Sequence, residues 1–148
     1  MEIAILGLGC FWGPESKFGE IEGVTKTEVG YCGGKYKNTT YQEVCTGSTG
    51  HAEVVKIEFD KNIISYEKII NLFFDFHDPT TLDRQGPDKG TQYRSEIFCL
   101  DESQKKVANK VLEKKNLDFK GKIVTKISDV FNYCRAEEYH QKYLIKNL

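Results

Sequence analysis

The segment Ile3-Ala4-Ile5-Leu6-Gly7-Leu8 is an apolar run that leads directly into Gly9-Cys10-Phe11-Trp12-Gly13 and Pro14. Such a run predicts a buried strand, and a glycine-flanked residue between it and a proline at a first helical position predicts a strand-to-helix turn. We therefore expect Cys10 to lie at a helix N-terminus, where free N–H groups and the helix dipole favour an anion and lower a thiol pKa. Cys10 is thus a candidate nucleophile, although an unreactive buried cysteine is the commoner case.

Composition predicts a single soluble domain spanning residues 1–148, a length that buries roughly two thirds of the unfolded surface. The 21 Lys and Arg against 22 Asp and Glu give a net charge of −1, which provides no basic surface for nucleic acid or an anionic membrane. The N-terminal apolar run is too short for a signal or membrane segment. Five cysteines without a CxxC pair fit neither a disulfide framework nor a zinc site, so we expect reduced thiols and a cytoplasmic location.

Hydrophobic periodicity predicts strands over residues 3–8, 24–31, 51–59, 93–100 and 122–128, and helices over 14–18, 66–76, 102–115 and 136–144. Two long loops, residues 35–50 and 77–92, are rich in turn-forming or polar residues, and loops of this length commonly carry function. The order of elements favours an α+β fold. We expect a two-layer α/β sandwich, a ferredoxin-like βαββαβ plait with additional elements, in which both loops lie near the Cys10 turn.

Glu53 stands out on the predicted strand 51–59, because period two places it on the face of Val55, Ile57 and Phe59. A carboxylate on an apolar face is costly unless it is paired, hydrogen-bonded or protonated. Either the strand begins one residue later and Glu53 lies in solvent, or Glu53 belongs to a functional site. We favour the site and expect a protonated carboxyl group at rest.

Ordered sequence blocks along nearly the whole chain resemble the peptide methionine sulfoxide reductase A family. The blocks are Gly9–Gly13, Gly30–Gly34, Tyr41–Gly47 continuing through Thr49–Glu53, His77–Thr80, Gln85–Asp88 with Gly90–Ser95, and Ala136–His140. The resemblance implies reduction of methionine S-sulfoxide, free or in proteins, on a two-layer α/β fold with no metal or organic cofactor. It also implies a role in protein repair after oxidative damage.

By position, the resemblance implies that Cys10 is the nucleophile and Glu53 the acid, with Tyr41, Asp88 and Tyr93 as polar site residues and Phe11 and Trp12 as aromatic walls around the substrate methyl group. A thiolate must attack the sulfoxide sulfur while the oxygen receives a proton, which a neutral carboxylic acid in an apolar pocket supplies. The products are methionine and a Cys10 sulfenic acid.

Several of these residues also have plain structural interpretations. Tyr41 and Tyr93 would serve as loop-packing residues, and Asp88 after a proline is ordinary turn chemistry. His51 is not assigned as a base. His77 and His140 are expected to be structural or surface residues, and the histidines and cysteines lack metal-ligand spacing.

Recycling is predicted to use an external thiol, such as a glutaredoxin and glutathione or a thioredoxin system, because the sequence ends at Leu148 without the cysteine-bearing tail of many family members. Cys32 and Cys134 are the internal alternatives. Some relatives carry selenocysteine at the Cys10 position, and the sequence leaves open which residue is natural. Two rival functions are a thiol hydrolase, which would need an imidazole base, and a non-catalytic redox sensor or methionine-peptide binder.

Overall fold

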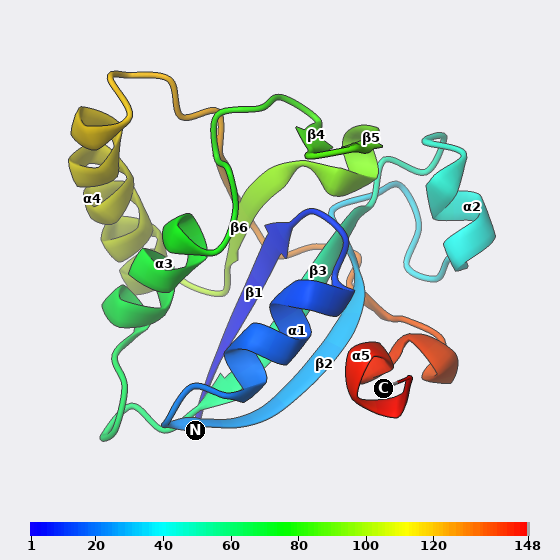
Figure 1. The fold of residues 1–148 in the computed structure, drawn as a ribbon, viewed down its shortest axis with the longest axis horizontal. Helices are drawn as coiled ribbons and strands as arrows, with labels where there is room; N and C mark the ends of the chain where they lie inside the picture. The colour runs from blue at the N-terminus through cyan, green and yellow to red at the C-terminus, as the bar shows by residue number, and fades with distance from the viewer. Residues whose placement is uncertain (148) are drawn as a thin grey trace.

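The computed structural model describes residues 1–147, which form one mixed sheet covered by helices (Figure 1). The sheet consists of β1 (Glu2–Leu8), β2 (Val24–Cys32), β3 (Ala52–Phe59), β6 (Ser95–Cys99), β7 (Lys126–Asp129) and β8 (Cys134–Arg135), in the order β7-β6-β1-β3-β2-β8. Neighbouring strands are antiparallel except β6 and β7, which are parallel. A separate hairpin joins β4 (Arg84–Gln85) to β5 (Asp88–Lys89).

The helices within the described residues are α1 (Trp12–Gly19), α2 (Tyr41–Cys45), α3 (Tyr66–Asp75), α4 (Glu102–Asp118) and α5 (Tyr143–Lys146), with 3-10 turns η1 (Thr91–Tyr93) and η2 (Glu138–His140). Ser65 and Asp101 cap α3 and α4 by accepting backbone N–H bonds from Lys68 and Gln104. No helix between residues 1 and 147 has the length and apolarity that crossing a bilayer requires.

The main core lies between one face of the sheet and the helices. It contains Leu6 of β1, Val55 and Ile57 of β3 and Phe73 of α3, all fully buried, and Val111 of α4. The opposite face of the sheet carries a smaller cluster with Ile5, Val54 and Phe98, against which Val130 and Tyr133 pack. Because β1 and β3 are covered on both faces, their sequences read as nearly continuous apolar runs.

The coarse prediction of an α+β fold with a central sheet is confirmed, and α3, α4 and β3 match their predicted ranges closely. The predicted helix over 136–144 is wrong: η2, an irregular stretch and α5 occupy this segment. The predicted strand 122–128 is shorter and later, as β7. The two predicted loops contain α2 and the β4–β5 hairpin, respectively. The helix has five residues and each strand has two, which is too short for a periodic pattern to be detected.

The fold brings distant segments to one end of the sheet. Figure 1 places α2 and the β4–β5 hairpin beyond the end of β1 at which the chain turns into α1, with the C-terminal segment nearby. Of the residues predicted for the site, Cys10 lies in the turn after β1, Tyr41 in α2 and Asp88 in β5, whereas Glu53 lies in β3 and Tyr93 in η1.

Candidate active site

A tight turn places Cys10 between β1 and α1. Gly9 has φ +93°, and a Cβ there would lie 2.7 Å from the Gln85 side chain, so only glycine suits this position. The helix begins at Trp12, with Phe11 as its N-cap, and Pro14 is the third helical residue rather than the first. Proline is tolerated there because its missing N–H would be unpaired in a first turn. Cys10 therefore precedes the first helical residue by two positions and the N-cap by one, so it lies just outside the helix N-terminus at which it was expected.

Glu53 lies inside β3 and is buried, so the alternative of a solvent-exposed Glu53 before the strand is wrong. Its side chain is 1% exposed, Oε1 accepts the backbone N–H of Phe11 at 3.3 Å, and Oε2 has no hydrogen-bond partner within residues 1–147. Burial raises the pKa of Glu53 to about 8; the Phe11 N–H bond opposes this rise and the charge of Asp88 adds to it. Glu53 is therefore a neutral carboxylic acid at pH 7, as its position in the sequence predicts.

The Cys10 thiol differs from its prediction. Burial raises its pKa to about 11, the Trp12 N–H bond to the sulfur lowers it, and the charges of Glu53, Asp88 and Cys45 raise it further. One backbone N–H does not outweigh the loss of solvent around the sulfur. The expectation of a lowered thiol pKa is wrong for the resting site, and Cys10 is a protonated thiol until a bound group stabilises its anion.

Three polar residues predicted for the site lie close enough to share its electrostatic field. Asp88 of β5 raises the pKa values of Cys10, Glu53 and Tyr93. Burial, followed by the charges of Glu53, Cys45, Asp88 and Cys10, raises the pKa of Tyr93 to about 12. Burial also raises the pKa of Tyr41, whose phenol is hydrogen-bonded with the Cys45 thiol. Both phenols therefore remain donors at neutral pH.

Aromatic rings enclose this group on one side. Phe11 is fully buried, with ring centroids 5.7 Å from Tyr31 and 5.2 Å from His140. Trp12 stacks on Tyr143 with centroids 3.7 Å apart and an interplanar angle of 7°. The Trp12 Nε1–H donates to His140 Nδ1 at 3.1 Å. The two predicted wall residues are thus held by rings from the C-terminal segment.

His140 and Glu137 of this segment were not predicted as site residues. His140, expected to be structural or on the surface, is 1% exposed and also packs on Tyr41 at 4.5 Å between centroids. Glu137 accepts the Tyr31 hydroxyl and the Tyr41 backbone N–H, each at 2.8 Å. These bonds lower the pKa of Glu137 although its burial opposes ionisation. The sequence block Ala136–His140 could have indicated that these residues belong to the site. The regular helix expected over 136–144 did not predict that Glu137 and His140 would contact it.

The remaining histidines have structural partners. His51 Nε2 lies 2.9 Å from the Tyr36 carbonyl oxygen, and burial lowers its pKa. His77 bonds the Phe73 carbonyl and Ser95 through its two ring nitrogens, and burial lowers its pKa to about 4. Neither one is among the groups that perturb Cys10.

All five cysteines are free thiols. Cys32, one of the two internal alternatives for recycling, is fully buried in β2, and its sulfur donates to the Phe131 carbonyl. Cys134 is half-buried and its thiol points to the Thr39 and Arg135 carbonyl oxygens. Cys45 is exposed and lies close enough to affect the Cys10 pKa. Within residues 1–147, no three or more His, Cys, Asp or Glu side chains are grouped to hold a metal ion.

The geometry combines a nucleophilic sulfur, a neutral carboxylic acid, two phenol donors and apolar walls. Such a site suits a reaction in which sulfur attacks while an oxygen of the substrate gains a proton. It does not suit a hydrolase of the Cys–His type, because no imidazole among the described residues is hydrogen-bonded to Cys10.

Comparisons with known proteins agree with this chemistry. A family model described as peptide methionine sulfoxide reductase matches residues 2–148. The peptide methionine sulfoxide reductase MsrA of Pelagibacter ubique is 67% identical over 146 residues, covering 99% of each chain. The reduced form of Mxr1 from Saccharomyces cerevisiae superposes with a TM-score of 0.94 and 38% identity, covering 99% of this chain and 85% of that one. Methionine sulfoxide reductase A of Corynebacterium diphtheriae superposes with a TM-score of 0.88 and 36% identity, covering 99% and 74%.

Proposed function

Since the chain belongs to the peptide methionine sulfoxide reductase family, as an oxidoreductase that reduces methionine sulfoxide in protein repair, we propose that Cys10 is its nucleophile and Glu53 its proton donor. The observation that carries this assignment is the buried Glu53 carboxyl group, protonated up to about pH 8 and close enough for its charge to raise the Cys10 pKa. A neutral acid beside a thiol is what the reduction of a sulfoxide requires.

In the proposed reductive step, the Cys10 sulfur attacks the sulfoxide sulfur as the sulfoxide oxygen takes the Glu53 proton. The oxygen is transferred to Cys10 and the sulfide form of methionine leaves. Glu53 then regains a proton from solvent, which balances the proton that the Cys10 thiol lost to solvent before the attack. The sulfoxide is reduced by two electrons and Cys10 is oxidised to sulfenic acid, so atoms and electrons balance.

Tyr41 and Tyr93 are proposed to act on the same oxygen, and Asp88 is proposed to act on Glu53. The two phenols donate hydrogen bonds as negative charge develops, and Asp88 helps to keep Glu53 protonated through its charge. Phe11 and Trp12 form the apolar wall for the methyl group. With the methyl group and the oxygen both fixed, the sulfur is open to attack from one face, which supports selectivity for the S epimer.

We further propose that an external thiol restores Cys10. A sulfenic acid condenses with one thiol to a mixed disulfide and water, and a second thiol releases Cys10, as a glutathione–glutaredoxin or thioredoxin system would supply. The complete burial of Cys32 and the orientation of Cys134 support this route over those two internal partners. Cys45 is the remaining candidate for an internal disulfide with Cys10, because it is exposed and close to that residue.

The cytoplasmic location remains a proposal, supported by the five free thiols. The finer description of the fold as a ferredoxin-like plait is proposed on the sub-order β6-β1-β3-β2, which suits a βαββαβ unit built from β1, α1, β2, β3, α3 and β6.

The test of the assignment uses a peptide with racemic methionine sulfoxide and a dithiol, and each epimer is followed by chromatography. The wild-type protein should consume the S epimer alone, and Cys10→Ser, with unchanged circular dichroism, should consume neither. Activity of Cys10→Ser within tenfold of wild type would contradict the role of Cys10, and equal loss of both epimers would contradict the proposed pocket.

A further inference from the structure

The C-terminal segment that holds Trp12 has little hydrophobic anchoring. None of the four residues of α5 is buried, and Ile145 is 59% exposed. A helix of this length is not stable by itself, so its position depends on contacts with the rest of the protein. The contacts that fix it are mostly polar.

Glu15 of α1 provides the central polar contact. Its side chain is 3% exposed, Oε1 accepts the Lys142 backbone N–H at 2.6 Å, and Oε2 accepts the Thr27 hydroxyl at 2.9 Å. The Lys142 ammonium lies 3.9 Å from Oε2. A single buried carboxylate thus joins α1, β2 and the residue that precedes α5.

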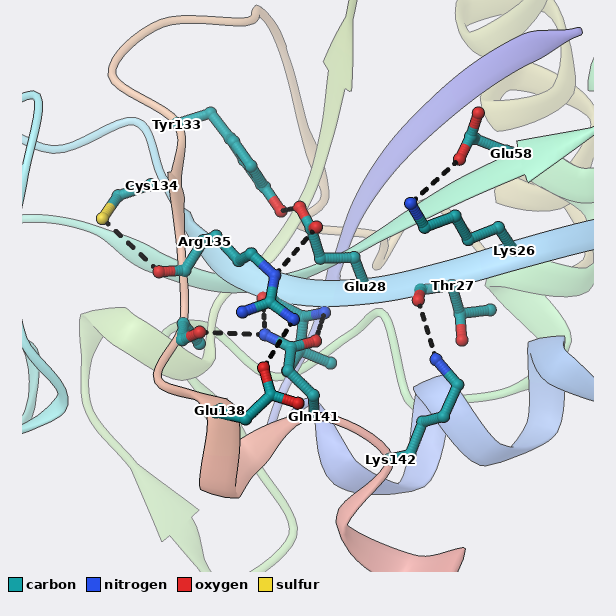
Figure 2. Close-up of polar contacts among 12 residues, drawn as sticks. Lys26, Thr27, Glu28, Glu58, Tyr133, Cys134, Arg135, Glu138, Gln141 and Lys142 are labelled. Carbon is teal, nitrogen blue, oxygen red and sulfur yellow. Dashed lines mark hydrogen bonds and ion pairs between the residues drawn. The ribbon is translucent and has the colours of Figure 1, made fainter.

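The residues beside Lys142 follow the edge of β2, as Figure 2 shows. The Gln141 side-chain amide bonds both the N–H and the carbonyl oxygen of Val29, and Lys142 Nζ donates to the Thr27 carbonyl oxygen at 3.2 Å. Lys142 has φ +52°, a left-handed conformation that is unfavourable for a residue other than glycine. The bond from its N–H to Glu15 helps to offset this cost.

Lys142 lies between the two residues that orient Trp12. His140 accepts the indole N–H, and Tyr143 stacks on the indole face. Trp12 and Glu15 are three residues apart on α1 and so share one face of the helix. The same helix therefore presents the indole and, through Glu15, fixes the segment against which the indole rests.

A cavity of about 280 Å³ separates α1, β2 and α5, with Trp12, Glu15 and Lys142 among its lining residues. Because this space is not filled by side chains, dense packing does not hold the indole and α5 together from that side. The Glu15 bonds therefore restrain α5 on the side of this cavity, in addition to the stacking of Tyr143 on the indole.

We infer that Glu15 is a positioning residue, which fixes the Trp12 wall of the substrate site through Lys142, His140 and Tyr143. This inference rests on the proposed function, because it concerns the wall that receives the substrate methyl group. The partners of the Glu15 carboxyl group are Lys142 and Thr27 rather than the reacting sulfur.

Trp12 is the only tryptophan in the sequence, so the intrinsic fluorescence of the protein reports on this ring directly. We expect Glu15→Ala to shift the emission to longer wavelength, to increase quenching by acrylamide, and to raise KM for a methionine sulfoxide peptide about tenfold, with a smaller change in kcat. Glu15→Gln retains an acceptor for the Lys142 N–H and should lie between Glu15→Ala and wild type in all three measurements. The rate of Cys10 alkylation should stay at the wild-type value.

Glu20→Gln is the matched control, because Glu20 is an exposed carboxylate at the end of the same helix and lines the same cavity. It should leave emission, quenching and KM unchanged. Wild-type emission and KM in Glu15→Ala, even with a lowered melting temperature, would overturn the inference by reducing Glu15 to a structural role. If Glu15→Ala does not fold, Glu15→Gln decides, and wild-type values there would overturn it.

Trp12→Phe separates this inference from the proposed function. If Trp12→Phe leaves KM unchanged, the assignment of Trp12 as a substrate wall fails, and the positioning role of Glu15 is then judged on fluorescence alone. If Trp12→Phe raises KM, the Glu15 variants must raise KM as well.

Discussion

Glu53→Gln is the substitution that tests the proposed chemistry most directly. It keeps the size of the side chain and an oxygen for the Phe11 N–H, but it removes the proton that Glu53 holds up to about pH 8. A glutamate with its ordinary pKa of 4.5 would be protonated about 0.3% of the time at pH 7, whereas a pKa of about 8 gives roughly 90%. The surroundings therefore raise the amount of available acid roughly 300-fold.

The two pKa values also define the pH dependence of the reductive step. The reactive form has a Cys10 thiolate and a protonated Glu53, and so carries one proton for the pair. Below about pH 8 the pair carries two protons, and the rate should rise tenfold per pH unit. Between about pH 8 and about pH 11 the pair carries one proton, and the rate should be flat.

The free energy of this reactive form is within reach of a bound substrate. The pKa of Glu53 is about 8 and that of Cys10 about 11, so in a singly protonated pair the proton favours the sulfur by a factor of at most roughly a thousand. At least one such pair in roughly a thousand therefore has its proton on Glu53. This population corresponds to a cost of at most about 4 kcal/mol. A sulfoxide oxygen that accepts a hydrogen bond from the Glu53 acid stabilises this form and lowers the cost.

The assay is single-turnover formation of methionine without reductant, from pH 5 to pH 10, with excess sulfoxide peptide. Glu53→Gln should be slower by about 10²- to 10⁴-fold, and its rate should continue to rise through pH 8 because only the thiol titrates. A Glu53→Gln profile that keeps the wild-type break near pH 8, or equal rates for the two proteins, would refute the assignment of Glu53 as the acid.

Three further predictions follow from the same geometry. Tyr41→Phe and Tyr93→Phe should each slow the single-turnover step less than Glu53→Gln, since either phenol partly replaces the other; a larger loss than that of Glu53→Gln would show that the ranking is wrong. Alkylation by iodoacetamide should report a Cys10 pKa of about 11 in wild type and a lower value in Glu53→Gln, because a nearby negative charge is removed. An unchanged value would place Glu53 outside the range of the sulfur. Intact mass after one turnover should show one added oxygen, followed by a mixed disulfide at Cys10 when a small thiol is added; prompt loss of two hydrogens with a peptide that joins Cys10 to Cys45, Cys32 or Cys134 would contradict external recycling.

The parts of the molecule that sequence reasoning predicted well are those with regular periodicity. The apolar run 3–8 and the alternating run 51–59 became adjacent central strands, with Leu6 opposite Val55. Glu53 could be recognised because it breaks the apolar face of its strand. These predictions depend on local patterns that a buried sheet imposes directly on its residues.

The C-terminal segment could not be predicted in this way, because its conformation is set by distant partners. Gln141 bonds Val29 and Lys142 bonds Glu15, across more than a hundred residues of sequence. Lys142 has a left-handed backbone conformation, and the Gln141 side-chain amide bonds the Val29 backbone as a neighbouring strand would. Neither feature produces a periodic pattern in the sequence. His140 was consequently placed outside the site, although its ring contacts both Phe11 and Trp12.

The error in the Cys10 pKa shows how burial affects the two reacting groups in opposite ways. Burial keeps Glu53 protonated, which suits an acid, and it also keeps Cys10 protonated, which opposes a nucleophile. Consecutive N–H groups of one turn divide between them: Phe11 donates to the carboxyl group and Trp12 to the sulfur. Each bond favours the anion of its partner, and neither one overcomes burial. At pH 7 the resting pair therefore keeps both protons, and a bound substrate oxygen that accepts a hydrogen bond from Glu53 favours the form with a Cys10 thiolate.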